Sequence, residues 1–212
     1  PDFTVITVCY NASKTIRKNI ESVLVQSGIT LEQVIIDGKS TDKTLSVIED
    51  FSDERVRVYS EPDNGIYDAM NKGLRYANGK YLIWINADDV LAGPKILSQI
   101  FNQLMPNHDV LCGSIEMVDK DGVVKRFWNS KTCVYFGGRL FLQAPHPGFV
   151  VKRKVLQENS IFYNPKLKIA SDMDFMLKLF NKGIAFQYSD TVVARMLVGG
   201  TSTNGIGSTW IG

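Results

Sequence analysis

The chain has 212 residues, is 44% hydrophobic and 22% charged, and carries a formal net charge of +2, a composition typical of one globular domain with a core of its own. No stretch approaches the roughly 20 apolar residues of a membrane-spanning helix, and the small net charge, without any nucleic-acid-binding motif, excludes nucleic acid as an expected partner. The three cysteines lack metal-binding spacing and the first residues lack a signal peptide's basic region, so we expect a cytoplasmic protein.

Strand and helix patterns alternate over the first hundred residues. Runs of β-branched and aromatic residues predict strands, and apolar residues at 3.6-residue spacing predict the helices between them. The expected elements are strand 3–10, a helix from residue 16 to near Gly28, strand 33–37, a helix capped by Ser40, Thr41 and Asp42, strand 56–59, helix 67–76, strand 81–85 and a helix opened by Pro94. This order predicts an α/β fold, with a Rossmann-like, mostly parallel sheet and helices on both faces.

The second half of the chain is less regular, and its turn signals predict a smaller antiparallel element. The expected elements are a hairpin over 115–127 turned at Asp121-Gly122, a rigid loop at 145–148, strand 149–151, helix 172–181, strand 186–193 and a flexible or truncated tail at 199–212.

Charge is unevenly distributed along the chain. Residues 1–106 carry a net charge of −3, whereas residues 107–212 carry +5. A basic second half suits an anionic acceptor or a peripheral contact with an anionic membrane surface. A solvated surface without a partner would explain the same excess.

Polar side chains follow three of the expected strands. Tyr10, Asp37 and the pair Asp88-Asp89 all come at strand ends. Ligands of parallel sheets bind where the carboxyl ends of the strands meet, so we expect these residues to form one site. Asp37 is suited to accept hydrogen bonds from a base or a ribose, whereas we expect Ser40, Thr41 and Asp42 only to cap a helix.

Asp88 and Asp89 give the sharpest chemical signal. Two adjacent carboxylates at the end of an apolar strand are costly unless a cation neutralises them. Carboxylate oxygens select hard ions such as Mg²⁺ or Mn²⁺, which bind through one or two carboxylates together with ligand phosphates. The alternative is an acidic loop that caps the helix opened by Pro94.

Four segments in a fixed order make a family resemblance specific. With them the chain resembles the family 2 glycosyltransferases of the GT-A fold over about residues 3–190. A later Ser171-Asp172 stands where that family usually has Glu-Asp. The four segments are VITVCYNA at 5–12, IDGKSTDKT at 36–44, NGIYDAMNKG at 64–73 and NADD at 86–89.

The resemblance implies a role for each matching residue. The nucleotide-sugar would be bound by five residues, the metal by a carboxylate pair, and the acceptor hydroxyl would be deprotonated by one catalytic base. The implied assignments are Thr7 and Tyr10 in the nucleoside pocket, Asp37 on the base, Asp68 near the sugar and diphosphate, Asp88 on the ribose or the metal, Asp89 on the metal, and Asp172 as the base.

The chain departs from the family pattern at several positions. Asn86 replaces the usual first aspartate of the metal motif, and no clear counterpart exists for a third metal ligand. Ser171 replaces a glutamate, which leaves Asp174 as a rival to Asp172, and Asp172 could instead serve only at the helix amino terminus. His146, held between two prolines, is either an acceptor contact or a structural residue.

The resemblance further implies one GT-A domain over residues 1–212. Residues 1–106 would form the nucleotide-sugar and metal half, residues 107–198 the acceptor half, and residues 199–212 the tail. The implied activity is inverting and Mn²⁺- or Mg²⁺-dependent transfer from a UDP-sugar to a hydroxyl of a saccharide acceptor. The implied acceptor is lipid-linked, at the inner face of the cytoplasmic membrane, in bacterial surface polysaccharide synthesis such as that of O-antigen.

Two other functions remain open from the residues alone. A nucleotidyltransferase would share the sheet and a metal carboxylate, although a glycine-rich phosphate loop would normally follow its first strand, where this chain has Tyr10-Asn11-Ala12-Ser13. A non-catalytic sugar-binding module would bind sugar without turnover, which would leave the Asp88-Asp89 pair without a role.

Overall fold

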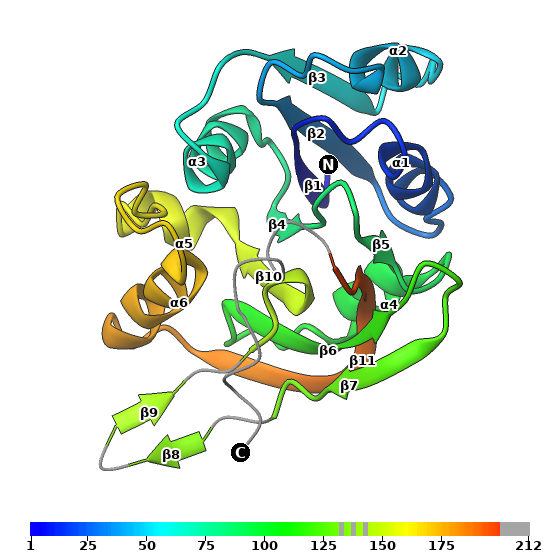
Figure 1. Cartoon of the computed structure of the whole chain (residues 1–212). Coiled ribbons are helices and arrows are strands. Elements are labelled where there is room, and N and C mark those ends of the chain that lie inside the picture. The colour runs from blue at the N-terminus through cyan, green and yellow to red at the C-terminus, as the bar shows by residue number, and fades with distance from the viewer. Residues whose placement is uncertain (132–133, 137–138, 142–143, 200–212) are drawn as a thin grey trace.

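Nine strands of the described chain form one mixed sheet (Figure 1). The structure is a computed structural model that describes residues 1–131, 134–136, 139–141 and 144–199. The strand order is β3-β2-β1-β4-β10-β6-β11-β5, with β7 paired to β6, and β8 pairs with β9 in a separate two-stranded sheet. The α/β fold with a mostly parallel sheet, as predicted, is confirmed.

The strands are β1 (Phe3–Cys9), β2 (Leu31–Asp37), β3 (Val56–Ser60), β4 (Tyr81–Trp84), β5 (Val90–Leu91), β6 (Val110–Val118), β7 (Val124–Trp128), β8 (Val134–Phe136), β9 (Arg139–Phe141), β10 (Phe149–Lys152) and β11 (Phe186–Leu197). The helices are α1 (Ile16–Leu24), α2 (Thr44–Glu49), α3 (Ile66–Tyr76), α4 (Ile96–Gln103), α5 (Arg153–Glu158) and α6 (Ser171–Asn181), with a short 3₁₀ turn at His146–Gly148.

The first four strands form a parallel sheet whose carboxyl ends lie in line. In the register of β1, β2 and β3, Cys9 stands opposite Asp37, and Asp37 stands opposite Ser60. β4 flanks β1 on the other side, where Trp84 pairs with Ile6. The polar residues that follow these strands are therefore gathered at one edge.

The rest of the sheet mixes directions. β10 runs antiparallel between β4 and β6, β11 runs parallel to β6, and β5 pairs antiparallel with β11. The predicted hairpin is confirmed as β6–β7, whose turn has Gly122 at a φ of +80° and a bond from its amide to the Asp119 carbonyl oxygen at 3.0 Å. The direction of β10 could not be read from its sequence, because a short apolar run does not report its partners.

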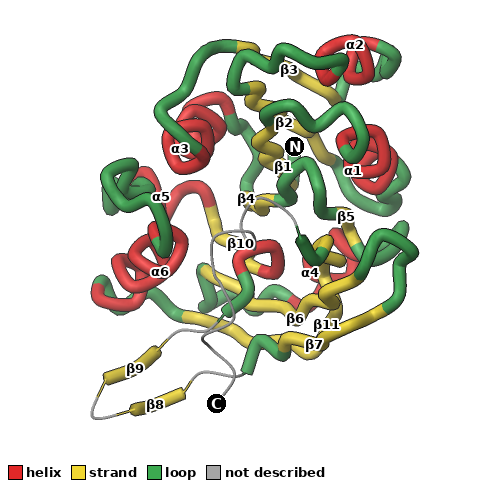
Figure 2. Tube along the Cα trace, in the orientation of Figure 1, coloured by secondary structure: helices red, strands yellow, loops and turns green. Residues whose placement is uncertain are grey.

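Helices cover both faces of the sheet, as the alternating pattern predicts (Figure 2). α3, α5 and α6 pack on one face around Trp84 and Phe175, while α1 and α4 pack on the other around Phe3 and Ile83. α2 packs beside α1 through a smaller apolar cluster that includes Ile16 and Ile48. Within the described ranges, no helix is long and apolar enough to span a bilayer.

Some expected elements differ in extent. α2 begins at Thr44, because Ser40 is bonded to Asp37 and because Asp42 accepts the Thr44 amide at 2.9 Å from outside the helix. β11 continues beyond its expected end at residue 193 through two register shifts. The tail expected at 199–212 lies, apart from its first residue, outside the described residues.

Gly79 is the tightest backbone contact beneath the parallel sheet. A Cβ at this position would lie 2.3 Å from the Thr4 amide nitrogen, and the Gly79 amide itself donates to Thr4 Oγ1 at 2.7 Å. We expect Gly79→Ala to lower the free energy of unfolding by about 2–3 kcal/mol, because the clash is with backbone that cannot move away. Urea denaturation measures this.

Gly122→Ala is the matched control for that substitution. Gly122 has a left-handed backbone conformation that disfavours a side chain, but nothing lies within 4 Å of its added Cβ. At Gly122 only the strain of the left-handed backbone should lower the free energy of unfolding, by about 1 kcal/mol. A loss at Gly79 no larger than the loss at Gly122 would contradict the packing argument.

Candidate active site

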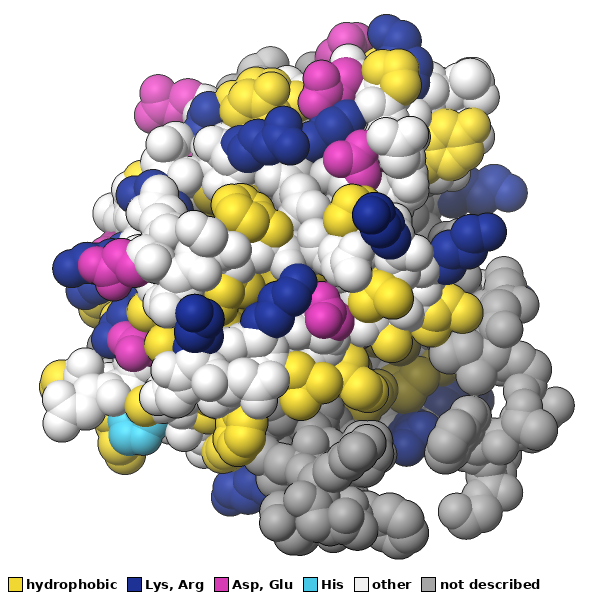
Figure 3. Space-filling view, turned by 90° about the vertical axis from the view of Figure 1, so that its left-hand side faces the viewer, with side chains coloured by type: hydrophobic (Ala, Val, Ile, Leu, Met, Phe, Trp, Pro, Cys, Tyr) yellow, Lys and Arg dark blue, Asp and Glu magenta, His cyan; other side chains and the backbone are white. Residues whose placement is uncertain are grey.

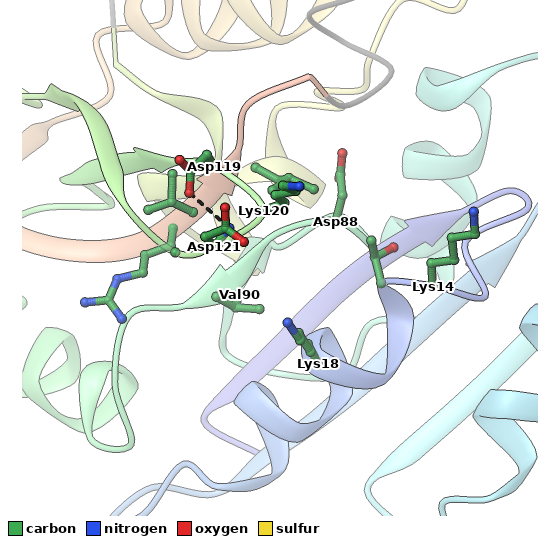
Figure 4. A pocket seen from close by; sticks show the side chains of 12 residues that line it. Lys14, Lys18, Asp88, Val90, Asp119, Lys120 and Asp121 are labelled. Atoms are coloured by element: carbon green, nitrogen blue, oxygen red, sulfur yellow. Dashed lines mark hydrogen bonds between the residues drawn. The ribbon is translucent and has the colours of Figure 1, made fainter.

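Two cavities open at the carboxyl edge of the parallel strands. The larger, of about 560 Å³, is lined by residues of the β1–α1 and β3–α3 loops, and the smaller, of about 450 Å³, lies between α1 and the β6–β7 turn. Thr15, Asp88 and Leu197 line both. In the close view of the smaller cavity, Asp88 stands between Lys14 and Lys18 on one side and Lys120 on the other (Figure 4).

The larger cavity offers an aromatic side chain and two polar ones. Tyr10 follows β1 and is 63% exposed, and Asn11 beside it has a left-handed φ of 51°. Asp63 follows β3 and lines the same cavity. Sequence reasoning missed Asp63. It lies in the Asp-Asn-Gly turn between β3 and α3, and ligands of parallel sheets bind at the edge where such loops follow the strands.

Asp37 lies beneath this cavity and not at its wall. It is fully buried, and its carboxylate accepts hydrogen bonds from the Ser40 hydroxyl, from the Ser40 amide at 3.0 Å and from Ser60 Oγ at 2.7 Å. Burial, with the charge of Asp37 adding to it, raises the pKa of the Cys9 thiol far above its ordinary value. Asp37 thus fixes the loop that follows β2, and contact with a base would require this bonding to change.

Thr7 is also placed below the cavity. It is fully buried, donates to the Ile85 carbonyl oxygen at 2.8 Å and accepts from Gln33 Nε2 at 3.0 Å. Thr7 is therefore not among the residues that line the larger cavity. Its hydroxyl belongs to a buried polar network under the loop after β4.

Asn19 is the centre of that network, and sequence reasoning missed it. Its side-chain amide donates to the carbonyl oxygens of Ile85, Asn86 and Asp89 at 3.2, 2.8 and 2.9 Å. The signal that could have found it is a polar residue on the buried face of α1, because a buried amide must be hydrogen-bonded. Asn19 holds the backbone of residues 85–89 from below.

The two carboxylates of this loop have different surroundings. Asp88 is partly buried and lines both cavities, and burial raises its pKa. Asp89 is only 2% exposed, lines neither cavity and accepts the Leu197 amide at 3.3 Å. Burial and the charge of Asp88 raise the pKa of Asp89. Asp88 is therefore the carboxylate that faces both cavities, and Asp89 is buried beside it.

The donor set suits a metal that is held mainly by a ligand's phosphates. Among the described residues, no group of three His, Cys, Asp or Glu side chains could enclose a metal ion. Mg²⁺ and Mn²⁺ are commonly bound through one or two carboxylates with phosphate oxygens completing the coordination.

The Asp68 carboxylate is hydrogen-bonded at the amino-terminal end of its own helix, α3. It lies in the first turn of α3, and its carboxylate accepts the Asn64 amide at 3.0 Å, with Lys72 Nζ 3.9 Å away. An acidic residue that bonds back to the chain before a helix stabilises its amino terminus. Asp68 lines neither described cavity, so the structure does not bring it to the donor side of the site.

Asp172 lies in the first turn of α6, facing Tyr67 of α3. Burial, together with the negative charge of Asp172, raises the pKa of Tyr67. Its rival, Asp174, forms an ion pair with Lys178 at 2.7 Å. The charge of Asp174 is therefore neutralised by a lysine, whereas Asp172 forms no ion pair within the described part of the chain.

His146 packs against the core beside this carboxylate. Its Nε2 lies 2.8 Å from the Tyr163 hydroxyl, and its ring lies 5.5 Å from that of Trp84. Burial lowers the pKa of His146, and the negative charge of Asp172 opposes that shift only in part. His146 is thus a buried, hydrogen-bonded residue. This placement fits the prediction that His146 is structural better than the prediction that it contacts the acceptor.

The burial of His146 predicts an acid-sensitive stability. A histidine whose folded pKa lies below its ordinary 6.5 binds fewer protons when folded, so the free energy of unfolding must fall as the pH drops below about 6.5. We expect His146→Gln to flatten this dependence in chemical denaturation between pH 5 and pH 7 (about the range in which histidine titrates).

His108, the other histidine of the chain, is the control. If His108→Gln flattens the dependence and His146→Gln leaves it unchanged, the assignment to His146 is wrong.

The chain is similar to a family of known proteins and to several individual members. Residues 4–168 match the family model described as Glycosyl transferase family 2. The chain is 31% identical over 125 residues to the UDP-Glc:alpha-D-GlcNAc-diphosphoundecaprenol beta-1,3-glucosyltransferase WfgD of Escherichia coli, covering 58% of this chain and 49% of that protein. It is 27% identical to the PGL/p-HBAD biosynthesis glycosyltransferase Rv2957 of Mycobacterium tuberculosis, over 92% of this chain and 76% of that one.

Solved structures share the fold. S. aureus TarS 1–349 in complex with UDP-GlcNAc superposes with a TM-score of 0.77 at 22% identity, over 97% of this chain and 61% of that one. The mannosyltransferase PcManGT of Pyrobaculum calidifontis, in complex with GDP-Man and Mn²⁺, gives a TM-score of 0.72 at 19% identity, over 97% of this chain and 59% of that one. The chain spans about half the length of WfgD and about three fifths of these two structures.

Proposed function

Because the chain belongs to glycosyltransferase family 2, we propose that it transfers a sugar from a UDP-sugar to a hydroxyl of a saccharide acceptor, with inversion at the anomeric carbon. The observation that carries the proposal is the cavity at the carboxyl edge of the parallel strands, which joins the exposed Tyr10, Asp63 and Asp88. Open parallel sheets bind nucleotides at this edge.

The donor would lie along that cavity. The exposed ring of Tyr10 offers a stacking surface to a base, and the carboxylate of Asp63 offers an acceptor to base or ribose donors. The diphosphate would then reach Asp88, which also faces the smaller cavity and its lysines. UDP is favoured among the nucleotides because TarS, which has a similar fold, is solved with UDP-GlcNAc.

Asp88 would hold a divalent cation together with the donor's diphosphate. Such an ion, when bound, stabilises the negative charge that develops on the departing nucleoside diphosphate. Similarity of fold to a mannosyltransferase in complex with Mn²⁺ supports this assignment. Asp89 would act indirectly, by fastening the end of β11 to the loop through its bond from Leu197.

Asp172 would be the general base. It would take the proton from the acceptor hydroxyl as the new bond from that oxygen to the anomeric carbon forms and the bond to the diphosphate oxygen breaks. Attack from the face opposite the leaving group inverts the anomeric centre, as in single-displacement glycoside chemistry. Asp172 lies near Tyr67, whose pKa its charge raises, whereas Asp174 is held by Lys178.

The acceptor we propose is lipid-linked, within bacterial surface polysaccharide synthesis. The name of WfgD describes transfer to a GlcNAc-diphosphoundecaprenol, and the similar ExoO of Rhizobium meliloti is named for succinoglycan biosynthesis. The excess of basic residues in the second half of the chain suits an acceptor that carries a diphosphate. Such an acceptor would place the enzyme at the inner face of the cytoplasmic membrane.

Calorimetric titration tests the donor site. UDP is titrated into the protein with Mn²⁺ and then with EDTA, and GDP and dTDP serve as competitors of different base. We expect UDP to bind at least about tenfold more tightly with metal. Failure of all three nucleotides to bind under either condition would refute the donor site. Binding of UDP without release of UDP from any UDP-sugar would instead favour a non-catalytic binding module.

A further inference from the structure

The loop that joins α5 to α6 exposes apolar side chains next to the proposed base. Every residue from Pro165 to Ala170 is exposed. Within it, the side chain of Leu167 is 37% exposed and that of Ile169 is 62% exposed. Phe162 before the loop and Met173 after it are 50% and 36% exposed. This is a dense run of exposed apolar residues, where soluble surfaces usually carry them singly.

The loop is fastened at its base. Tyr163 is buried and exchanges two hydrogen bonds with Asn71 of α3, at 3.0 and 2.9 Å. Asn164 caps the turn by accepting the amides of Lys166 and Leu167, each at 3.1 Å, and its own amide donates to Ser171 Oγ at 2.7 Å. The apolar tip is therefore presented by an ordered turn.

Two lysines alternate with the apolar side chains of the loop. Lys166 and Lys168 flank Leu167, and neither forms an ion pair within the described part of the chain. Between Glu158 and Asp172 the sequence has no acidic residue. Figure 3 views the molecule from the side of α3, α5 and α6, where hydrophobic and basic side chains lie next to one another. The loop thus has a local charge of one sign.

We propose that Phe162, the loop residues 165–170 and Met173 form a docking surface for an anionic lipid bilayer. Leu167 and Ile169 would enter the boundary between headgroups and acyl chains, while Lys166 and Lys168 would pair with lipid phosphates. Interleaved apolar and basic residues are what such interfacial contacts use. A protein partner fits less well, because a convex turn of six residues offers far less than the roughly 800 Å² that each side of a stable protein interface buries.

A membrane contact at this loop would serve the proposed transfer reaction, and this step of the argument rests on the proposed function. The loop leads directly into Ser171 and Asp172 at the start of α6. Docking it on a bilayer would bring the proposed base close to the headgroup level, where the hydroxyls of a lipid-linked saccharide would lie. The larger cavity opens elsewhere, at the β1–α1 and β3–α3 loops, so a water-soluble UDP-sugar would still reach it.

Vesicle co-sedimentation tests the proposal on the whole chain. Vesicles of phosphatidylcholine alone are compared with vesicles in which about a third of the lipid is the anionic phosphatidylglycerol. The variants are Leu167→Ser with Ile169→Ser, and Lys166→Gln with Lys168→Gln. We expect wild type to prefer the anionic vesicles, and the lysine pair to lose about 25-fold in partitioning, since each lysine near such a surface contributes about fivefold.

A matched control combines Met105→Ser with Lys95→Gln, because Met105 is 55% exposed and Lys95 is an exposed lysine away from this loop. Equal binding of the loop variants and wild type would overturn the proposal, as would absence of binding to anionic vesicles or an equal loss in the control. UDP titration of the same samples separates the two claims. Vesicle binding without UDP binding would refute the donor site and leave the docking surface standing.

Discussion

Asp172→Asn is expected to lower kcat for sugar transfer by about 10²–10⁴-fold, the range that a positioned general base contributes. The asparagine amide keeps the size of the side chain, but it cannot take a proton from the acceptor hydroxyl. The affinity for UDP should be unchanged, because Asp172 lies at α6 and outside the residues that line the larger cavity. Release of UDP from UDP-sugars in the presence of acceptor measures the effect.

Asp174→Asn is the control for that experiment. Asp174 lies two residues on in the same helix turn, where its carboxylate pairs with Lys178 at 2.7 Å. A partly exposed i,i+4 ion pair of this kind contributes only a few tenths of a kcal/mol, so turnover should change little. A larger loss of kcat in Asp174→Asn than in Asp172→Asn would reverse the assignment of the base.

Asp88→Asn is expected to abolish the metal dependence of UDP binding. Asp88 lines both cavities, and an amide that replaces a metal-binding carboxylate loses the charge that attracts the ion. We expect the UDP affinity measured with Mn²⁺ to fall by about tenfold or more, to the level that wild type shows with EDTA. Calorimetry with and without metal gives both values.

Asp89→Asn separates the two neighbouring carboxylates. Asp89 is buried and lines neither cavity, and an asparagine can still accept the Leu197 amide. We therefore expect the UDP affinity with Mn²⁺ to stay close to that of wild type. If Asp89→Asn loses the metal dependence and Asp88→Asn keeps it, then the orientation of this loop in solution differs from the one described, and the carboxylate pair was assigned correctly from sequence.

The parallel half of the fold could be predicted because its signals are local. Fully buried strands such as β1 and β4, in a chain where strands alternate with helices that have one apolar face, allow little except a covered parallel sheet. The antiparallel insertion of β10 could not be foreseen, because pairing partners depend on residues far away in the chain. Nor could the two register shifts that extend β11 to Leu197.

The sequence predicted where the site lies better than it predicted which side chains line it. The ends of β1, β2 and β4 do meet, so Tyr10 and Asp88 were placed correctly at the cavity. The sequence could not tell which residues at the strand ends face the cavity and which are buried beneath it. Thr7 and Asp37 are buried, whereas Asp63, three residues past the end of β3, lines the cavity. One residue along a strand reverses the direction of a side chain, and loops add freedom beyond that.

The three hydrogen bonds from Asn19 have a consequence for how this enzyme could be redesigned. They reach the carbonyl oxygens of Ile85, Asn86 and Asp89, so a substitution that changes only a side chain of this loop removes none of these three bonds. The side-chain oxygen of Asn86 has no hydrogen-bond partner in the described chain. Position 86 can therefore be exchanged for another residue at small structural cost, which makes it the place where selectivity for a different donor would be sought first.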